Sequence, residues 1–268
     1  MILMTVSTLG ITGSTFSSPR SIWKPTLIGI GMNYAVLTTS LLALNALLVH
    51  DTDLRIGFVI IAVVPPAVAV LPFTLFLEGN KQFSLLGMVG AYLAALVITP
   101  ALALALLGPG FISVSKLILI IVELILAPLV FSRILLRLGL DSPLGAVKGP
   151  ITNWGFFLVS YAVVGLNREI ILSHPLSLLP VAFIAVVSTF LLGWVIERAG
   201  KHFRVEPDTL VSLVLLGTLK NYGLAGGMAL ALFSEKTSVP ATVSSVFMIV
   251  YIIWLELKKR RTEQGGIG

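Results

Sequence analysis

The sequence has no cysteine, and charged residues make up only 11% of its 268 residues, whereas soluble domains carry about 25%. The absence of cysteine excludes disulfide bridges, thiolate metal ligands and cysteine nucleophiles. The three histidines lie in loops or near the ends of apolar runs, and neither a glycine-rich phosphate loop nor a Ser–His arrangement is present. We therefore expect no enzyme, no metal site, no cofactor and no pump driven by ATP.

Apolar residues dominate instead, at 57% of the chain, with a mean hydropathy of +1.03. A helix that crosses a bilayer needs about 20 mostly apolar residues. The sequence predicts an all-α membrane protein with eight to nine transmembrane helices, the ninth being the short run Met1–Thr12. The other eight runs are Pro25–Val49, Ile56–Leu77, Phe83–Leu107, Leu117–Ser132, Gly149–Asn167, Pro175–Ile196, Thr209–Ser234 and Thr237–Leu255.

We attribute the net charge of +6 to basic residues in the loops rather than to a nucleic-acid-binding surface. With the basic tail Lys258–Arg261 placed inside and the loops alternated, thirteen Lys and Arg residues fall inside and four outside. Cytoplasmic loops carry such an excess of basic residues. We expect an integral protein of the plasma membrane with a cytoplasmic C-terminus, whose partner is the lipid bilayer and not nucleic acid.

Two of the predicted spans are interrupted near their middles. Ile56–Leu77 contains Pro65 and Pro66, and proline breaks or kinks a helix. Thr209–Ser234 contains Lys220-Asn221-Tyr222-Gly223 and then Gly226-Gly227. Irregular backbone survives at membrane depth only where protein or a water-filled cavity satisfies its polar groups.

The two interruptions lie in comparable contexts. Shifting the chain by 157 residues places Leu75–Glu78 on Leu232–Glu235 and Pro65-Pro66 on Tyr222-Gly223. In the predicted topology these two spans run in opposite directions, which is typical of an inverted-repeat transporter with its site at the midplane. The alternative is a pair of ordinary kinks, since proline and glycine are common in membrane helices.

The stretch Gly217–Ala225, followed by Leu230–Phe233 and Pro240, resembles the bile acid:sodium symporter family, and the resemblance extends over nearly the whole chain. Family members have ten helices, more than this chain offers. The resemblance implies a core domain with two broken, crossing helices and a panel domain, with an organic anion bound between them. The core would comprise residues 25–108 and 175–258, and the panel residues 1–14 and 112–168, all in one transporter unit.

The sodium sites that the resemblance implies are altered here. The family's Ser-Asn pair after the first break falls on Val70 and Leu71, and a nearby threonine falls on Met88, while the serine is kept as Ser84. The family's glutamate on the second broken helix falls on Leu216. Aliphatic side chains give a hard cation no oxygen ligand, so conventional sodium coupling is doubtful.

Lys220 stands where the family has glutamine, beside the retained Asn221. Intramembrane charges are costly and usually functional. Lys220 would supply the positive charge permanently, or would gain and lose a proton during transport, with Glu123 as its partner. The candidate substrate and coupling residues are therefore Lys220, Asn221, Glu123, Pro65, Pro66, Gly223 and Ser84. The amides Asn33, Asn45 and Asn153 are expected to make interhelical hydrogen bonds.

These observations favour a secondary active transporter of a small organic anion, working by alternating access and linked to protons rather than to sodium. Two alternatives remain open. One is a sodium:organic anion symporter whose ion ligands come from other residues. The other is a membrane scaffold or receptor that has kept the fold and lost transport.

Overall fold

The computed structural model describes residues 19–108, 114–140, 168–173 and 175–265, together with Thr5 and scattered positions between 147 and 165. The predicted spans Met1–Thr12 and Gly149–Asn167 lie largely outside these residues. The helices are α2 Pro19–Ile30, η2 Gly31–Leu37, α3 Thr38–Leu48, α4 Thr52–Val63, α5 Val70–Phe76, α6 Lys81–Leu107, α7 Val114–Ile121, η3 Val122–Leu126, α8 Ala127–Arg137, α10 Arg168–Ser173, η4 Pro175–Leu178, α11 Leu179–Val186, η5 Val187–Leu191, α12 Leu192–His202, α13 Pro207–Thr218, α14 Tyr222–Leu232 and α15 Glu235–Gly265.

Four continuous helices in this part of the chain are long and apolar enough to cross a membrane: Ile22–Leu48, Lys81–Leu107, Leu179–His202 and Glu235–Arg261. Their outer surfaces expose large apolar side chains, among them Leu47 at 73% and Val97 at 72%. Polar side chains such as Asn33 and Thr99 are buried instead. This arrangement suits a surface that contacts lipid. The protein is an α-helical membrane protein, and the total of eight to nine spans stays a prediction.

The first interrupted span is α4 followed by α5. Residues that precede proline avoid the helical region, and Val64, before Pro65, is extended with ψ 156°. Helix α4 therefore ends at Val63. Helix α5 resumes at Val70 and tolerates Pro72 in its first turn, where the backbone N–H groups lack helical partners in any case.

The second interrupted span is α13 followed by α14, and its break lies at Leu219–Asn221. The expected glycine interruption at Gly226-Gly227 is wrong, because both residues, like Gly223, lie within α14. The side chain of Asn221 accepts a hydrogen bond from the Leu224 N–H at 3.0 Å and so caps the new helix. This break therefore depends on a cap and on tertiary contacts rather than on proline or glycine.

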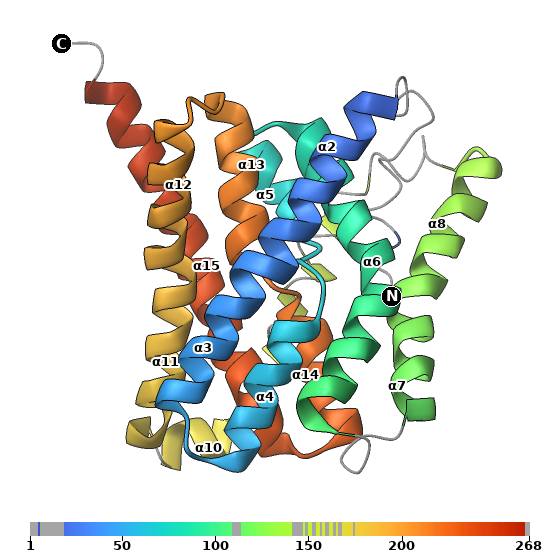
Figure 1. Cartoon of the computed structure of the whole chain (residues 1–268), viewed down its shortest axis with the longest axis vertical. Coiled ribbons are helices and arrows are strands. Elements are labelled where there is room, and N and C mark those ends of the chain that lie inside the picture. The colour runs from blue at the N-terminus through green and yellow to red at the C-terminus, as the bar shows by residue number, and fades with distance from the viewer. Residues whose placement is uncertain are drawn as a thin grey trace.

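Helices α4 and α13 each contain 12 residues, and they begin and end 155 residues apart. The offset of 157 residues expected from the sequence is therefore two residues too long for these halves. In Figure 1, α4 and α14 lie toward the lower end of the molecule, and α5 and α13 lie toward the upper end. The two interrupted spans thus meet at their breaks.

Close contact between helices α2 and α6 depends on glycine. An added Cβ at Gly29 would lie 2.4 Å from the Cα of Gly87, and one at Gly90 would lie 2.4 Å from Cγ2 of Thr26. Small residues of this kind allow membrane helices to approach closely. The packing holds η2, which continues α2, against the core that contains the two breaks.

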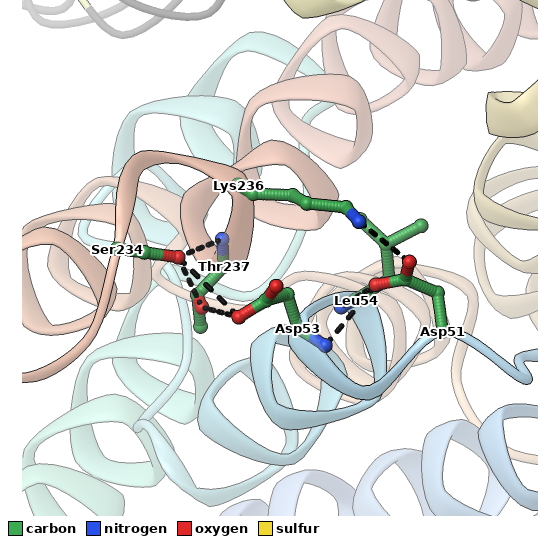
Figure 2. A network of polar contacts seen from close by, with 6 residues as sticks. All are labelled: Asp51, Asp53, Leu54, Ser234, Lys236 and Thr237. Carbon is green, nitrogen blue, oxygen red and sulfur yellow. Dashed lines mark hydrogen bonds and ion pairs between the residues drawn. The ribbon is translucent and has the colours of Figure 1, made fainter.

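A polar network ties the start of α4 to the connection between α14 and α15 (Figure 2). Lys236 Nζ donates to Asp51 Oδ2 at 2.6 Å. Asp53 Oδ1 accepts from the hydroxyls of Ser234 at 3.4 Å and Thr237 at 3.3 Å. The Asp51 side chain also caps α4, accepting from the N–H of Asp53 at 3.1 Å. This network joins the lower ends of the two interrupted spans.

Candidate functional site

The two breaks are hydrogen-bonded to each other through their main chains. The Asn221 N–H donates to the Pro65 carbonyl at 3.0 Å, and the Ala67 N–H donates to the Leu219 carbonyl at 3.2 Å. Pro66 and Lys220 form an antiparallel bridge between these two bonds. Backbone groups that left their helices are thereby paired without water, as a span in lipid requires.

Lys220 projects from this crossing into a cluster of oxygen atoms and is 0% exposed. Its Nζ donates to Asn33 Oδ1 at 2.7 Å and to Thr38 Oγ1 at 3.0 Å. The carbonyl oxygens of Ala62 at 2.8 Å and Val64 at 2.9 Å also lie within hydrogen-bonding distance, so the three N–H groups of an ammonium are shared among four acceptors. The Tyr34 ring lies 4.8 Å from the nitrogen, within the range of a cation–π contact.

The arrangement of these partners favours a protonated lysine. The Ala62 and Val64 carbonyls only accept, and the Thr38 hydroxyl points its own donor at the Ala62 carbonyl, 2.6 Å away. An ammonium has three donors and no acceptor, whereas a neutral amine would direct a lone pair at an oxygen. The ammonium also lies at the C-terminal end of α4, where the helix dipole favours positive charge.

Five consecutive carbonyls, from residue 62 to residue 66, accept hydrogen bonds from outside their own helix. The end of a helix leaves such groups without partners, and an unpaired carbonyl in lipid costs several kcal/mol. The donors are, in order, Thr38 and Lys220 to Ala62, Thr99 at 2.7 Å to Val63, Lys220 to Val64, the Asn221 N–H to Pro65, and the Tyr92 hydroxyl at 2.9 Å to Pro66.

Asn221 connects the two breaks a second time through Tyr92. The Asn221 amide donates to the Tyr92 hydroxyl at 3.0 Å, and that hydroxyl donates in turn to the Pro66 carbonyl. Asn221 therefore caps α14, donates its backbone N–H to Pro65 and holds Tyr92 in place. Asn221 thus contacts both breaks, through its backbone and its side chain.

The structure brings together four of the residues singled out from the sequence: Lys220, Asn221, Pro65 and Pro66. Gly223 lies next to them in the first turn of α14. Glu123 does not join them. It lies in η3 with its side chain exposed, and the Lys220 ammonium contacts four oxygen atoms of other residues. The expected Lys220–Glu123 pair is therefore not formed in this structure.

Ser84 is not among the residues whose oxygens contact Lys220, and its hydroxyl lies 2.7 Å from that of Thr74 on α5. The positions at which the resemblance implies sodium ligands are buried and aliphatic. Val70 and Leu216 are 0% exposed, and Leu71 is 3% exposed. Thr74 and Ser84 supply hydroxyl oxygens beside α5, but Val70, Leu71 and Leu216 add no side-chain oxygen.

Asn33, Thr38, Tyr92 and Thr99 belong to the site and were not singled out from the sequence as site residues. Asn33 lies in η2, a π-helical turn, and π-helical turns often occur at functional sites. Its Oδ1 accepts from Lys220, while its Nδ2 is buried and has no hydrogen-bond partner among the described residues. A buried donor of this kind suits an acceptor oxygen from a water or a ligand.

Four long apolar helices, packed with two interrupted helices that are joined around the buried Lys220, define a polytopic integral membrane protein with a polar centre. No family model matches the chain. The chain is 24% identical over 232 residues to the "Uncharacterized sodium-dependent transporter YocS" of Bacillus subtilis, which covers 85% of this chain and 71% of that protein.

Proposed function

We propose that this protein is a secondary active transporter of a small organic anion that works by alternating access. The observation that carries the proposal is the pair of interrupted membrane helices, joined at their breaks and holding a fully buried Lys220. Discontinuous helices that meet inside the bilayer typically form the binding sites of secondary transporters. The similarity to a protein described as a transporter supports the same class.

The charge of the site favours an anionic substrate. Lys220 brings a formal positive charge, and its four contacting oxygens come from neutral groups. Because the ammonium is enclosed, the substrate would feel its field without touching it in this state. The unpartnered Nδ2 of Asn33 and the N-terminal end of α14 would add donors for a carboxylate.

We further propose that transport is linked to protons through Lys220. A buried lysine is able to lose its proton when the surroundings of the ammonium change. In the described state four acceptor oxygens surround Nζ, so proton release would be coupled to movement of the side chain away from these oxygens. The exposed Glu123 would then act only in a different state of the cycle, when it approaches Lys220.

Sodium coupling is the second candidate, and the similarity to a protein named as sodium-dependent favours it. In that case the ion would use oxygens other than the side chains of Val70, Leu71 and Leu216. The hydroxyls of Thr74 and Ser84, 2.7 Å apart, would offer it two side-chain oxygens. The two candidates differ in which ion gradient drives uptake.

Counterflow in proteoliposomes tests the proposal. Vesicles loaded with one unlabelled organic anion at a time should accumulate the labelled anion, and a panel of mono- and dicarboxylates would identify the class. A proton gradient should stimulate uptake by wild type and not by Lys220→Gln. Replacing a sodium gradient by a potassium gradient should leave the rate of uptake unchanged. Glu123→Gln provides a second test of the proton link.

Each other outcome has a defined meaning. Proton-dependent uptake that survives in Lys220→Gln would remove Lys220 from the coupling. Uptake that requires sodium would replace the proton link by the sodium symporter. A protein that is folded and mediates no counterflow of any anion in the panel would contradict the proposal and favour a non-transporting scaffold.

A further inference from the structure

A hollow of about 300 Å³ opens between helices α12, α13 and α15, at the end of the molecule where the C-terminal turns of α15 lie beside α12 (Figure 1). Three lysines, Lys201, Lys258 and Lys259, line it together with Glu197. The rest of its lining is apolar and comprises Leu77, Pro207, Leu210, Val211, Val214 and Leu255. The hollow therefore combines an apolar surface with a group of ammonium ions.

The charged and the apolar residues are separated along the helix axes. Lys201 lies in the last turn of α12, and on α15 Leu255 precedes Lys258 by about one turn. Helix α13 runs the opposite way, from Pro207 at this end to Val214 about 10 Å further in. The lysines thus lie toward the end of the molecule, with Val214 and Leu255 deeper. A phospholipid in a bilayer has the same order, with its phosphate outside and its acyl chains inside.

Carboxylates hold the three ammonium groups at the hollow. Lys201 Nζ donates to Glu197 Oε1 at 2.6 Å, and Lys258 Nζ donates to Glu197 Oε2. Lys259 forms an ion pair with Glu78, which follows α5, at 2.7 Å. Three lysines against two glutamates leave an excess of positive charge at this part of the described chain. An anion is therefore the ligand that complements the hollow.

An aromatic residue places Lys258 at the level of the lipid headgroups. Lys258 Nζ lies 5.2 Å from the ring centroid of Trp254, one turn earlier on α15, and tryptophan is enriched at the interface between membrane and water. A second hollow of about 320 Å³ is lined by Trp254, Leu257, Lys258 and Arg261. The basic surface thus continues around α15 at this depth, where clustered lysine and arginine attract anionic lipids.

We propose that the hollow between α12, α13 and α15 binds an anionic phospholipid. Its phosphate lies at Lys201 and Lys258, and an acyl chain lies along the apolar side chains of α13. Leu77 follows α5, and Leu210 and Val214 belong to α13, so the lipid contacts both interrupted spans at this end. The inference concerns lipid binding alone and does not rest on the proposed transport function.

Thermal unfolding of the full chain tests the site. The protein is delipidated in a non-ionic detergent, and either phosphatidylglycerol or phosphatidylcholine with the same acyl chains is added to the micelles. A ligand that binds only the folded state raises the Tm by mass action. We expect a saturable rise of about 5 °C with phosphatidylglycerol at about 100 times its Kd, and a much smaller rise with phosphatidylcholine. Glycerol 3-phosphate, which has the phosphate without acyl chains, should not reproduce the rise.

Substitutions locate the binding. Lys201→Gln combined with Lys258→Gln should abolish most of the rise, while the glutamines still offer donors to Glu197. Arginine at both positions should retain the rise, because guanidinium binds phosphate. Lys81→Gln is the matched control. Lys81 begins α6 at the same end, where the Asn80 N–H donates to the Asp208 carbonyl at 2.9 Å, but it does not line the hollow. This variant should keep the full rise.

Four results would overturn the proposal. They are equal rises with the two lipids, an equal rise with glycerol 3-phosphate, a full rise in the double glutamine variant, and an equal loss in Lys81→Gln. If the double variant does not fold, Lys201→Gln alone replaces it, because this side chain is 66% exposed, and a rise as large as that of wild type would then count against the site. None of these measurements involves transport, so lipid binding and transport stand or fail separately.

Discussion

The Asn221 N–H donates to the Pro65 carbonyl at 3.0 Å, and this bond joins the breaks of two helices through residues 156 positions apart in the chain. Proline ends the first helix, and the carbonyls that it leaves unpaired receive donors from the second helix and its neighbours. The site thus forms where backbone N–H and carbonyl groups of one span are hydrogen-bonded to those of another. The following predictions concern the groups that hold this arrangement together.

Lys220→Met should lower the free energy of unfolding by about 3 kcal/mol or more, because it leaves several buried acceptors with fewer donors. Methionine is similar in length and apolar. The loss of stability therefore reflects removal of the ammonium rather than a change in side-chain volume. Lys236→Met removes a surface ion pair and should cost less than about 1 kcal/mol. Thermal unfolding in detergent measures both, and equal losses would contradict the special role of Lys220.

Tyr92→Phe should destabilise the protein by about 1–3 kcal/mol, because the Asn221 amide and the Pro66 carbonyl both lose their partner. Tyr161 provides the matched control. It is 71% exposed, so Tyr161→Phe should change the stability by less than about 0.5 kcal/mol. If Tyr92→Phe were as stable as Tyr161→Phe, the hydrogen bonds of Tyr92 would not contribute to the free energy of unfolding.

Gly29→Ala should cost about 1–3 kcal/mol, because the new methyl group would lie against the backbone of Gly87 and force α2 away from α6. Gly31, two residues further on, has nothing within 4 Å of an added Cβ. Gly31→Ala should therefore be neutral or stabilising by up to about 1 kcal/mol. Unfolding of the two variants side by side separates steric overlap from helix propensity, and the opposite order would contradict the close helix contact.

The Asp51–Lys236 pair should add a small, pH-dependent stability. The hydrogen bond from Lys236 holds the pKa of Asp51 below its usual range. A carboxylate with a lowered folded-state pKa stabilises the protein above its unfolded pKa, about 3.9, and loses that effect as the pH falls through the folded value. Because the pair is exposed, the contribution should stay below about 1 kcal/mol.

Lys236→Met measures this effect. Its Tm should lie slightly below that of wild type at pH 7, and the difference should shrink as the pH falls below about 4. Lys81→Met, which changes an exposed lysine at the start of α6, should show no such convergence. A difference for Lys236→Met that is constant from pH 7 to pH 3 would exclude Asp51 as its cause.

The long apolar runs and Pro65 were sufficient to predict the membrane class, the positions of the described long helices and the first break. These features are sufficient because hydropathy and proline determine the structure of the segment in which they occur. The second break was placed near Lys220 correctly, but the glycines that suggested its extent are helical. Residues Leu219–Asn221 leave the helix because their backbone pairs with the other break. The local sequence pattern does not predict this tertiary partner.

The partners of Lys220 could not be predicted in the same way. Asn33 is separated from it by 187 residues, and Thr38 by 182. A polar residue in a membrane span has many possible partners, and only the packing of α2 on α6 places η2 beside the crossing. The choice of Glu123 followed from charge alone, whereas the structure satisfies the lysine with neutral oxygens.

The hydrogen bonds that join the two breaks run from main chain to main chain, at Pro65 with Asn221 and at Ala67 with Leu219. The acceptors are carbonyl groups, which every residue has, and the donors are backbone N–H groups, which every residue except proline has. These two bonds therefore do not depend on which side chains stand at positions 219 and 221. A substitution at position 220 therefore changes the group that faces Asn33 and Thr38 but leaves the main-chain bonds of the crossing in place.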